Sequence, residues 1–296
     1  MDKKLDAYKW GAVTVKGFIP PIIFMEFLSR RVLPIAVDMR TLEHITYTPA
    51  PDIIHEAAGH APIIANTDYA DYLCAYGEVA KKAIQSKHDS ELYKIVKKMS
   101  NMKEDPHVSD VELKKIEAEL EKKSSESHWT SEANELARMN WWTIEYGLIG
   151  DLNNPKIYGA GLLSSVSESL ECLNKKIKKI PISIECINQD YNITEPQPQL
   201  YVANNFKDLI KILDDYSKTM GFKIGGKDGI KKAVQSENVT TVVYDSGLQI
   251  SGIIKNYIND NNGEITYLSY DENVQLSYGD NEVPNHGIDY HSEGYG

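Results

Sequence analysis

The chain has 296 residues, 42% of them apolar, which is enough for one large or two small domains with a hydrophobic core. Its 32 Lys and Arg against 43 Asp and Glu give a net charge of -11, which disfavours nucleic acid and anionic membranes as partners. The three cysteines lie far apart and form no CxxC pair, so neither a disulfide framework nor a structural zinc site is expected. The most apolar run, residues 18–28, is too short to span a bilayer. We therefore expect a protein of the reducing cytoplasm.

Helical periodicity dominates the first two thirds of the chain. Apolar residues recur three and four positions apart, the pattern of an amphipathic helix, in residues 69–87, 89–102, 110–126 and 131–149. Residues 87–127 are dense in Lys and Glu and have few large apolar side chains, which predicts a solvated helical hairpin inserted into the core. We expect a mainly α domain over residues 1–235.

The C-terminal part has a different composition. Residues 256–296 contain no Lys or Arg but eight Asp and Glu. Residues 240–254 are rich in Val, Ile and Thr, and the turn Asn261-Asn262-Gly263 precedes a partly alternating run. Residues 236–296 are therefore predicted to form a small, acidic, β-rich segment.

The string His55-Glu56-Ala-Ala-Gly59-His60 contains the residue types of a metal site. Histidines four residues apart with a Glu between them are typical of zinc proteases. Here the second histidine comes five residues after the first, about 140° around a regular helix, so both can face one point only if the helix is distorted near Gly59. Alternatively, they are two unrelated histidines of one helix.

A second segment, Trp141-Trp142-Thr-Ile-Glu145, would as a helix place a carboxylate on one face with both Trp residues, Leu148 and Ile149. Burying that carboxylate without a partner is costly. The partner is either an Arg or a metal ion held by the two histidines, and two His with one carboxylate form the facial triad of non-haem iron oxygenases.

A third segment, Tyr158-Gly-Ala-Gly161-Leu-Leu-Ser164, is rich in glycine and hydroxyls. Its glycines would let the backbone approach a ligand closely, and its hydroxyls could orient a histidine or a carboxylate. A tight turn at the start of a helix is the simpler interpretation.

Together these segments resemble the catalytic domain of the pterin-dependent aromatic amino acid hydroxylases, from about residue 12 to about residue 206. The motifs in order are Pro51-Asp-x-x-His-Glu-x-x-Gly-His60-x-Pro62, Trp141-x-Thr-x-Glu145-x-Gly147, Tyr158-Gly-Ala-Gly-Leu-Leu-Ser-Ser165 and Thr194-Glu-x-Gln-Pro198. The resemblance implies that family's helical basket and a monooxygenase that uses Fe(II), tetrahydrobiopterin or a related tetrahydropterin, and dioxygen. The implied substrate is a small aromatic amino acid. The expected reaction is the conversion of L-phenylalanine to L-tyrosine, which is the commonest activity of the bacterial proteins that the chain resembles.

The resemblance also implies roles for individual residues. The implied metal ligands are His55, His60 and Glu145. The residues implied to grip the substrate carboxylate or to wall the side-chain pocket are Arg40, Thr48, Pro51, Trp141, Tyr146, Ser164 and Ile193. The residues implied at the pterin are Gly17, Phe18, Ile19, Phe24 and Glu56. Catalytic roles are expected for Glu56, through a hydrogen bond to pterin or bound water, and for Ser164, which would orient the histidines.

Alternative roles are open for Arg40, and the role of Asp52 is also undecided. Arg40 could instead form a surface salt bridge with Asp38 or Glu43. Asp52 could orient a histidine or simply cap a helix.

The chain also departs from the family pattern. Pro21, Pro34 and Asn140 replace residues that are usual at the pterin side. The family's catalytic domain normally has a further helical stretch upstream, and the bacterial members with a similar long insertion are longer than this chain. The resemblance therefore implies an N-terminally shortened domain and an acidic C-terminal segment that is cut short.

Two other functions compete with the hydroxylase. One is a non-catalytic or truncated remnant of the family that retains the metal site. The other is a zinc hydrolase that uses His55, Glu56 and His60. The sequence does not indicate an oligomeric state.

Overall fold

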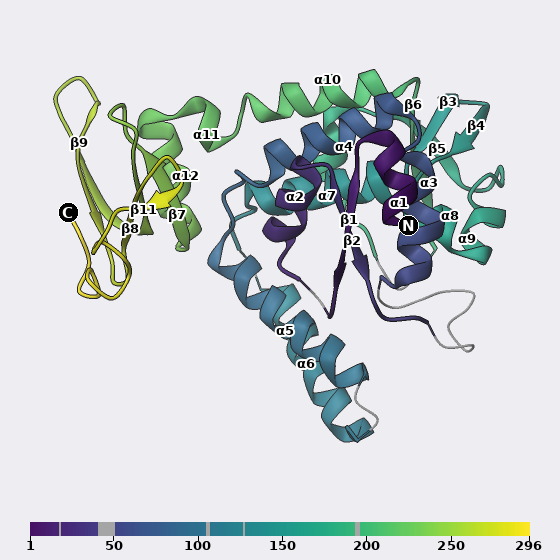
Figure 1. Ribbon diagram of the computed structural model, residues 1–296, viewed down its shortest axis with the longest axis horizontal. Helices are drawn as coiled ribbons and strands as arrows, with labels where there is room; N and C mark the ends of the chain where they lie inside the picture. Colours follow the sequence, from purple (N-terminus) through teal and green to yellow (C-terminus); the bar gives the residue numbers. More distant parts are fainter. Residues whose placement is uncertain (18, 41–50, 105–106, 127, 193–195) are drawn as a thin grey trace. The chain divides into compact units, whose positions relative to one another are not determined.

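The computed structural model describes the chain except for residues 18, 41–50, 105–106, 127 and 193–195. Three predicted site residues, Phe18, Thr48 and Ile193, therefore lie outside the described residues. The chain forms two compact units (Figure 1). Unit 1 comprises residues 1–82, 93–124 and 135–217, and unit 2 comprises residues 83–92, 125–134 and 218–296.

Unit 1 combines helices with two small sheets. Its strands are β1 (Gly11–Val15), β2 (Val32–Ala36), β3 (Leu148–Asp151), β4 (Asn154–Ile157), β5 (Lys178–Pro181) and β6 (Gln199–Ala203). Its helices are α1 (Asp2–Leu5), α2 (Pro21–Ser29), α3 (Ala61–Ile63), α4 (Thr67–Ala80), α6 (Asp110–Ser125), α8 (Ala160–Ser164), α9 (Val166–Glu171) and α10 (Phe206–Ser217). Helices α5 (Lys87–Glu104) and α7 (Glu132–Asn140) begin in unit 2 and continue into unit 1.

Helices α2 and α4 pack closely in unit 1. Strands β1 and β2 pair in parallel, with Gly11 opposite Val32, and α2 connects them. At Gly77 of α4 a Cβ would lie 2.6 Å from the backbone oxygen of Met25 and the backbone nitrogen of Ser29. A larger residue would therefore push the two helices apart.

The second sheet of unit 1 has the strand order β4-β3-β6-β5. Strand β3 runs antiparallel to β4 and parallel to β6, and β5 is parallel to β6. The core against this sheet contains Tyr146, Leu148, Leu162, Cys172, Leu200 and Val202.

The prediction of one helix over residues 131–149 is wrong at its C-terminal end. Helix α7 ends at Asn140, a π-helical turn covers Trp141–Glu145, and Leu148 enters β3 opposite Val202. Pairing with β6, more than fifty residues away in the sequence, satisfies the backbone of this segment, and local periodicity carries no information about such a distant partner. Trp141, Trp142, Glu145, Leu148 and Ile149 therefore do not share one helical face.

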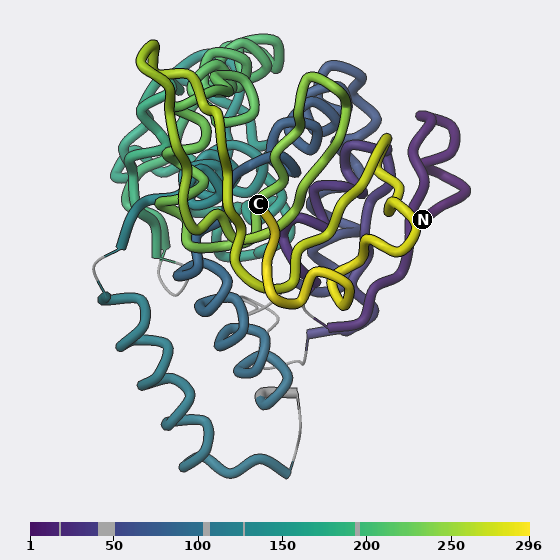
Figure 2. The backbone as a smooth tube through the Cα atoms, turned by 90° about the vertical axis from the view of Figure 1, so that its left-hand side faces the viewer, coloured from purple at the N-terminus to yellow at the C-terminus, as the bar shows by residue number. Residues whose placement is uncertain are grey.

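The Lys- and Glu-rich stretch is a pair of helices. Helices α5 and α6 run side by side and project as a hairpin in both views (Figures 1 and 2). Most of α6 is exposed or half-buried, and Ile116 is its buried apolar residue. A mixed-charge surface of this kind suits a solvated hairpin.

Unit 2 is built on a five-stranded antiparallel sheet. Its strands are β7 (Val239–Val243), β8 (Leu248–Asn259), β9 (Ile265–Tyr270), β10 (Gln275–Tyr278) and β11 (Asn281–Glu282). They follow the order β11-β10-β8-β7, with β9 also paired to β8, and the β8–β9 hairpin is prominent in Figure 2. Helices α11 (Gly221–Ile224) and α12 (Gly226–Ser236) precede the sheet. Ile230 and Ala233 of α12 pack on Ile250 and Ile254 of β8, so the alternating residues of β8 supply the core of this unit.

A buried carboxylate joins the sequence-distant parts of unit 2. Glu132 is 1% exposed and accepts hydrogen bonds from the backbone of Gly221 at 2.7 Å, from Lys232 Nζ at 2.8 Å and from the backbone of Ile84 at 3.1 Å. These bonds tie residues 83–92 and 125–134 to the C-terminal part of the unit.

The mainly α class describes the chain only in part. Helices account for about 47% of the residues and strands for about 21%, so the sheets are a substantial part of both units. In the described part of the chain, every helix is too short or too polar to cross a membrane.

Candidate metal centre

The two histidines of the His-Glu motif come together because the helix there is π-helical. Residues His55–His60 form a π-helix, in which backbone hydrogen bonds run from residue i to residue i+5. Side chains five residues apart therefore lie above one another. His55 Nε2 and His60 Nε2 are 3.1 Å apart, so the distortion that the spacing requires is present. Short π-helical turns occur often at functional sites.

Glu145 completes the cluster from a second π-helical turn. Its two carboxylate oxygens lie 3.4 Å from His55 Nε2 and 3.3 Å from His60 Nε2. An oxygen of Glu56 lies within 4.8 Å of both histidine ligand atoms, and Glu56 Oε2 is buried without a hydrogen-bond partner among the described residues. Imidazole nitrogens and carboxylate oxygens that converge in this way fit a divalent transition metal.

Glycines allow helix α8 to approach the cluster. A Cβ on Gly59 would lie 2.6 Å from the backbone oxygen of Ala160 and 2.9 Å from its Cα. A Cβ on Gly159 would collide with the backbone oxygen of Glu145. The segment from Tyr158 to Ser164 therefore packs directly on both metal-site turns, which agrees with the close backbone approach that its glycines suggest.

The charges of the three side chains depend on one another. Burial lowers the pKa of His55 to about 4, against the opposing charge of Glu145. Burial also disfavours a charged His60, but the Glu145 carboxylate outweighs it and raises the pKa of His60 to about 9. Burial opposes ionisation of Glu145, yet the two histidines lower its pKa to about 2. Glu145 is therefore ionised and His60 holds a proton that a metal ion would have to displace.

Glu56 has a different protonation equilibrium. Burial and the negative charges of Glu145 and Asp52 raise its pKa to about 7, although His60 acts in the other direction. At neutral pH its carboxyl group can thus both donate and accept a hydrogen bond. This property suits a group that contacts a cofactor or a bound water.

Ser164 fixes the tautomer of His55. Its Oγ donates a hydrogen bond to the backbone oxygen of Ala160 at 2.7 Å, so it can only accept from His55 Nδ1, which is 2.9 Å away. His55 therefore carries its proton on Nδ1 and turns an unprotonated Nε2 toward His60 and Glu145. Outer hydrogen bonds of this kind orient metal ligands.

We expect Ser164→Ala to weaken metal binding by about 10–100-fold, because His55 would lose the acceptor that holds its ring and tautomer. Anaerobic titration with Co(II), followed by visible absorption, measures the effect. Ser169→Ala is the matched control, because among the described residues the hydrogen bond of Ser169 Oγ goes to the backbone oxygen of Val166 within α9. Equal loss of affinity in both variants would contradict this role.

Arg40 is buried and paired with Asp52 rather than with Asp38; Glu43, the other partner expected from the sequence, lies outside the described residues. Its Nε and Nη2 donate to the two carboxylate oxygens of Asp52 at 2.9 and 2.7 Å, and its Nη1 donates to the backbone oxygen of Ser164 at 2.9 Å. Both side chains are almost fully buried. Two of the five guanidinium N–H groups are not used in these bonds, so Arg40 retains donors for a further carboxylate.

Asp52 connects Arg40 to the metal centre. Its carboxylate also accepts from the backbone nitrogens of Arg40 at 2.8 Å and His55 at 2.9 Å. Burial alone would raise the pKa of Asp52, but the hydrogen bonds from Arg40 and His55 lower it below its ordinary value. Asp52 thus holds the start of the π-helix and the guanidinium in one network. Its bond to the backbone nitrogen of His55 is a capping contact, whereas the His55 ring is bonded by Ser164.

Aromatic rings stack next to Glu145. The Trp141 ring lies between Tyr146, at a centroid distance of 4.5 Å, and Tyr191, at 4.3 Å. Pro51 is exposed. Tyr191 was not among the site residues expected from the sequence. Its position two residues before Ile193 is the one feature that could have indicated it.

The residues predicted to bind the pterin have fewer contacts with the candidate metal centre than Arg40 and Ser164 have. Gly17 has a left-handed backbone with φ of 66°, and Ile19 and Phe24 are half-buried near the start of α2. Among the described residues, none of these three has a hydrogen bond or ring contact with Glu56. Their roles stay predictions.

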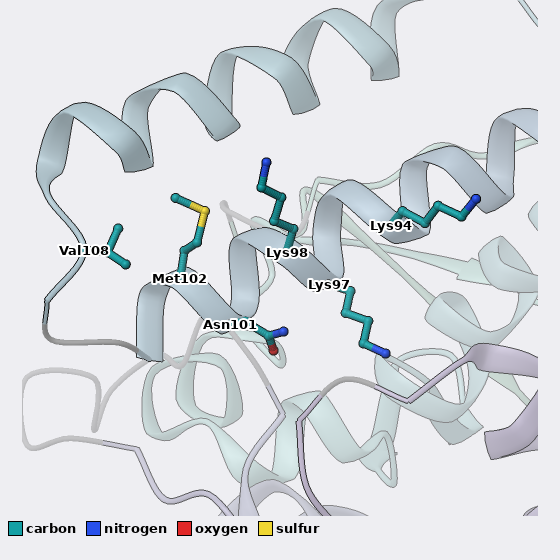
Figure 3. A pocket seen from close by; sticks show the side chains of 6 residues that line it. All are labelled: Lys94, Lys97, Lys98, Asn101, Met102 and Val108. Carbon is teal, nitrogen blue, oxygen red and sulfur yellow. The ribbon is translucent and has the colours of Figure 1, made fainter.

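A separate hollow of about 400 Å³ lies on the α5–α6 hairpin, lined by Lys94, Lys97, Lys98, Asn101, Met102 and Val108 (Figure 3). In Figure 3, Lys98 and Met102 point toward the partner helix, whereas Lys97 and Asn101 point away from it. The lysines therefore do not converge on one point, and the hollow contains none of the metal-site residues.

The cluster of His55, His60 and Glu145 defines a candidate two-histidine, one-carboxylate metal centre, and comparison with known proteins identifies the family of the chain. The family model for "Biopterin-dependent aromatic amino acid hydroxylase" matches residues 9–94 and 106–226. The chain belongs to this family.

Relatives and solved structures agree with the family. A phenylalanine-4-hydroxylase of Chromobacterium violaceum is 30% identical over 209 residues, which cover 70% of this chain and 56% of that protein. One of Pseudomonas aeruginosa is 27% identical and is matched over 62% of its length. The crystal structure of the C. violaceum enzyme with iron(III) and 7,8-dihydrobiopterin matches with a TM-score of 0.54 at 28% identity, over 73% of this chain and 64% of that one. The chain thus spans little more than half the length of the first of these relatives.

Proposed function

We propose that this chain is an iron- and tetrahydropterin-dependent monooxygenase that hydroxylates the ring of an aromatic amino acid, with L-phenylalanine as substrate and L-tyrosine as product. The observation that carries the proposal is the convergence of His55, His60 and Glu145 within 3.1–3.4 Å of one another. Membership of the hydroxylase family supports it. So do the iron and dihydrobiopterin in the C. violaceum structure.

In this proposal the three converging side chains hold Fe(II). Two histidines and one carboxylate leave positions on the metal for dioxygen and water. Iron and the tetrahydropterin supply the redox chemistry that activates dioxygen. Ser164 keeps His55 in the ligating tautomer, and Glu56 offers a hydrogen bond to the pterin or to a water. The pterin would lie along Gly17, Phe18, Ile19 and Phe24.

The substrate is held by its carboxylate and its ring. Arg40 is fixed by Asp52 and Ser164, so its remaining N–H groups form a preorganised donor for the amino acid carboxylate. Trp141 and Tyr146 form an aromatic stack with Tyr191, and this stack would wall the pocket for the substrate ring. Thr48, Pro51 and Ile193 complete the proposed substrate site.

The test is anaerobic Fe(II) loading followed by oxygen consumption with tetrahydrobiopterin and each of Phe, Trp and Tyr, with products identified by mass spectrometry. We expect hydroxylation of Phe in step with pterin oxidation. Glu145→Gln should bind iron weakly and make no product, whereas Glu171→Gln, an exposed carboxylate of α9, should behave as the wild type.

The same experiment separates the competing functions. Stoichiometric iron without product would favour the non-catalytic remnant. Peptide or ester hydrolysis with Zn(II), lost in Glu56→Gln, would favour the zinc hydrolase, which the family match does not support. A cytoplasmic location and the absence of nucleic acid and membrane partners stay predictions.

A further inference from the structure

The phenol of Tyr69 is buried without a hydrogen-bond partner among the described residues. Tyr69 lies in the first turn of α4, its exposed fraction is 0%, and its ring contacts the rings of Tyr158 and Phe206 at 5.8 and 5.3 Å. A buried hydroxyl that has lost its hydrogen bonds to water costs free energy unless another group replaces them. A hydrogen-bond partner for the Tyr69 hydroxyl is therefore expected in the metal-bound protein.

The other buried tyrosines of the same helix are satisfied. Tyr72 Oη is 2.8 Å from Thr143 Oγ1, and Tyr76 Oη donates to the backbone oxygen of Leu136 at 2.6 Å. Both side chains are as deeply buried as Tyr69. Burial on this face of α4 therefore does not by itself explain an unpaired hydroxyl at Tyr69.

The position of Tyr69 relates it to the metal centre. Tyr158, which its ring contacts, directly precedes Gly159, the residue that packs on the backbone of Glu145. Burial raises the pKa of the Tyr69 phenol well above its ordinary value, and the charges of Glu145 and Glu56 raise it further. The phenol therefore keeps its proton and can donate a hydrogen bond.

We infer that Tyr69 is a positioning residue of the metal centre, whose phenol O–H donates a hydrogen bond to an oxygen atom bound to the metal. That oxygen is either the carboxylate of Glu145 or a coordinated water. The inference rests on the proposed function, because the bond forms only when the site holds a metal. Groups that hold metal ligands in place commonly change metal affinity by about 10–100-fold.

The experiment compares Tyr69→Phe with the matched control Tyr76→Phe, using Co(II) as the probe. Thermal unfolding is measured without metal and with saturating Co(II), and affinity and the visible Co(II) spectrum are measured by anaerobic titration. We expect Tyr69→Phe to be at least as stable as the wild type without metal, to bind Co(II) about tenfold more weakly and to shift the Co(II) bands. Tyr76→Phe should be less stable with and without metal, with unchanged affinity and spectrum.

Equal Co(II) affinity and identical spectra for the wild type and Tyr69→Phe would overturn the inference while leaving the proposed function intact. Destabilisation of metal-free Tyr69→Phe to the same degree as Tyr76→Phe would also overturn it, because the hydroxyl would then have a partner in the metal-free protein. A wild type that binds neither Co(II) nor Fe(II) would overturn both this inference and the proposed function.

Discussion

Replacing Gly59 by alanine is expected to disrupt the metal centre without touching any ligand. The new Cβ would lie 2.6 Å from the backbone oxygen and 2.9 Å from the Cα of Ala160, and neither atom can move away by a change of rotamer. The π-helix and α8 must separate. Overpacking of this kind costs about 1–3 kcal/mol of stability. Because His55 is held by Ser164 on α8, the same movement would misplace a ligand, and a displacement of about 1 Å can reduce activity about 100-fold.

The prediction is checked by urea unfolding and by Co(II) titration of the purified variant. Gly11→Ala is the matched control, because the nearest atom of the described residues to a Cβ there is Val32 Cγ2, at 3.7 Å. It should leave stability and metal affinity close to those of the wild type. Wild-type metal affinity in Gly59→Ala would mean that the close packing of α8 on the π-helix is not needed for the site.

The local sequence pattern singled out His55, His60 and Glu145, and the family resemblance joined them into one set of implied metal ligands. His55 and His60 stand five residues apart, and that spacing excludes a regular helix as a common ligand face. The π-helix at His55–His60 resolves the conflict through i to i+5 hydrogen bonds. For Glu145 the local pattern left two partners open, an Arg or a metal ion. The helical face on which it placed Glu145 with Leu148 is not formed, because Leu148 pairs with Val202.

Other features could not be derived because they depend on distant contacts. The apolar periodicity predicts that Leu148 lies near the end of a helix, yet Leu148 pairs with Val202 between the parallel strands β3 and β6. Arg40 has acidic neighbours in sequence, but the structure pairs it with Asp52. The Asp52 carboxylate also accepts a hydrogen bond from the backbone nitrogen of His55, the first residue of the π-helix. Tyr191 reaches Trp141 only through the fold. Periodicity and motif spacing describe neighbours along the chain, whereas these contacts depend on which elements pack together.

Breaking the Arg40–Asp52 ion pair is expected to lower the stability of the fold. Arg40→Met would leave the Asp52 carboxylate buried without its guanidinium partner, and removal of one member of a buried pair typically costs about 3–5 kcal/mol. We expect the variant to show a correspondingly lower midpoint of urea unfolding with an unchanged slope. Adding Asp52→Asn should recover part of the loss, because the neutral amide can still accept from the backbone of His55 while no charge remains buried.

The pH dependence of stability gives an independent check on the Arg40–Asp52 pair. The native environment lowers the pKa of Asp52 below its ordinary value of 3.8, so its ionised form stabilises the fold above that pH and the contribution is lost as the pH falls through the native pKa. The stability difference between the wild type and the double variant Arg40→Met/Asp52→Asn should therefore shrink in acid. If it stayed constant from pH 7 to pH 3, or if the two substitutions were simply additive, the pair would not act as a unit. Arg40 would then be free of Asp52, and its proposed role as a fixed clamp for the substrate carboxylate would lose its structural basis.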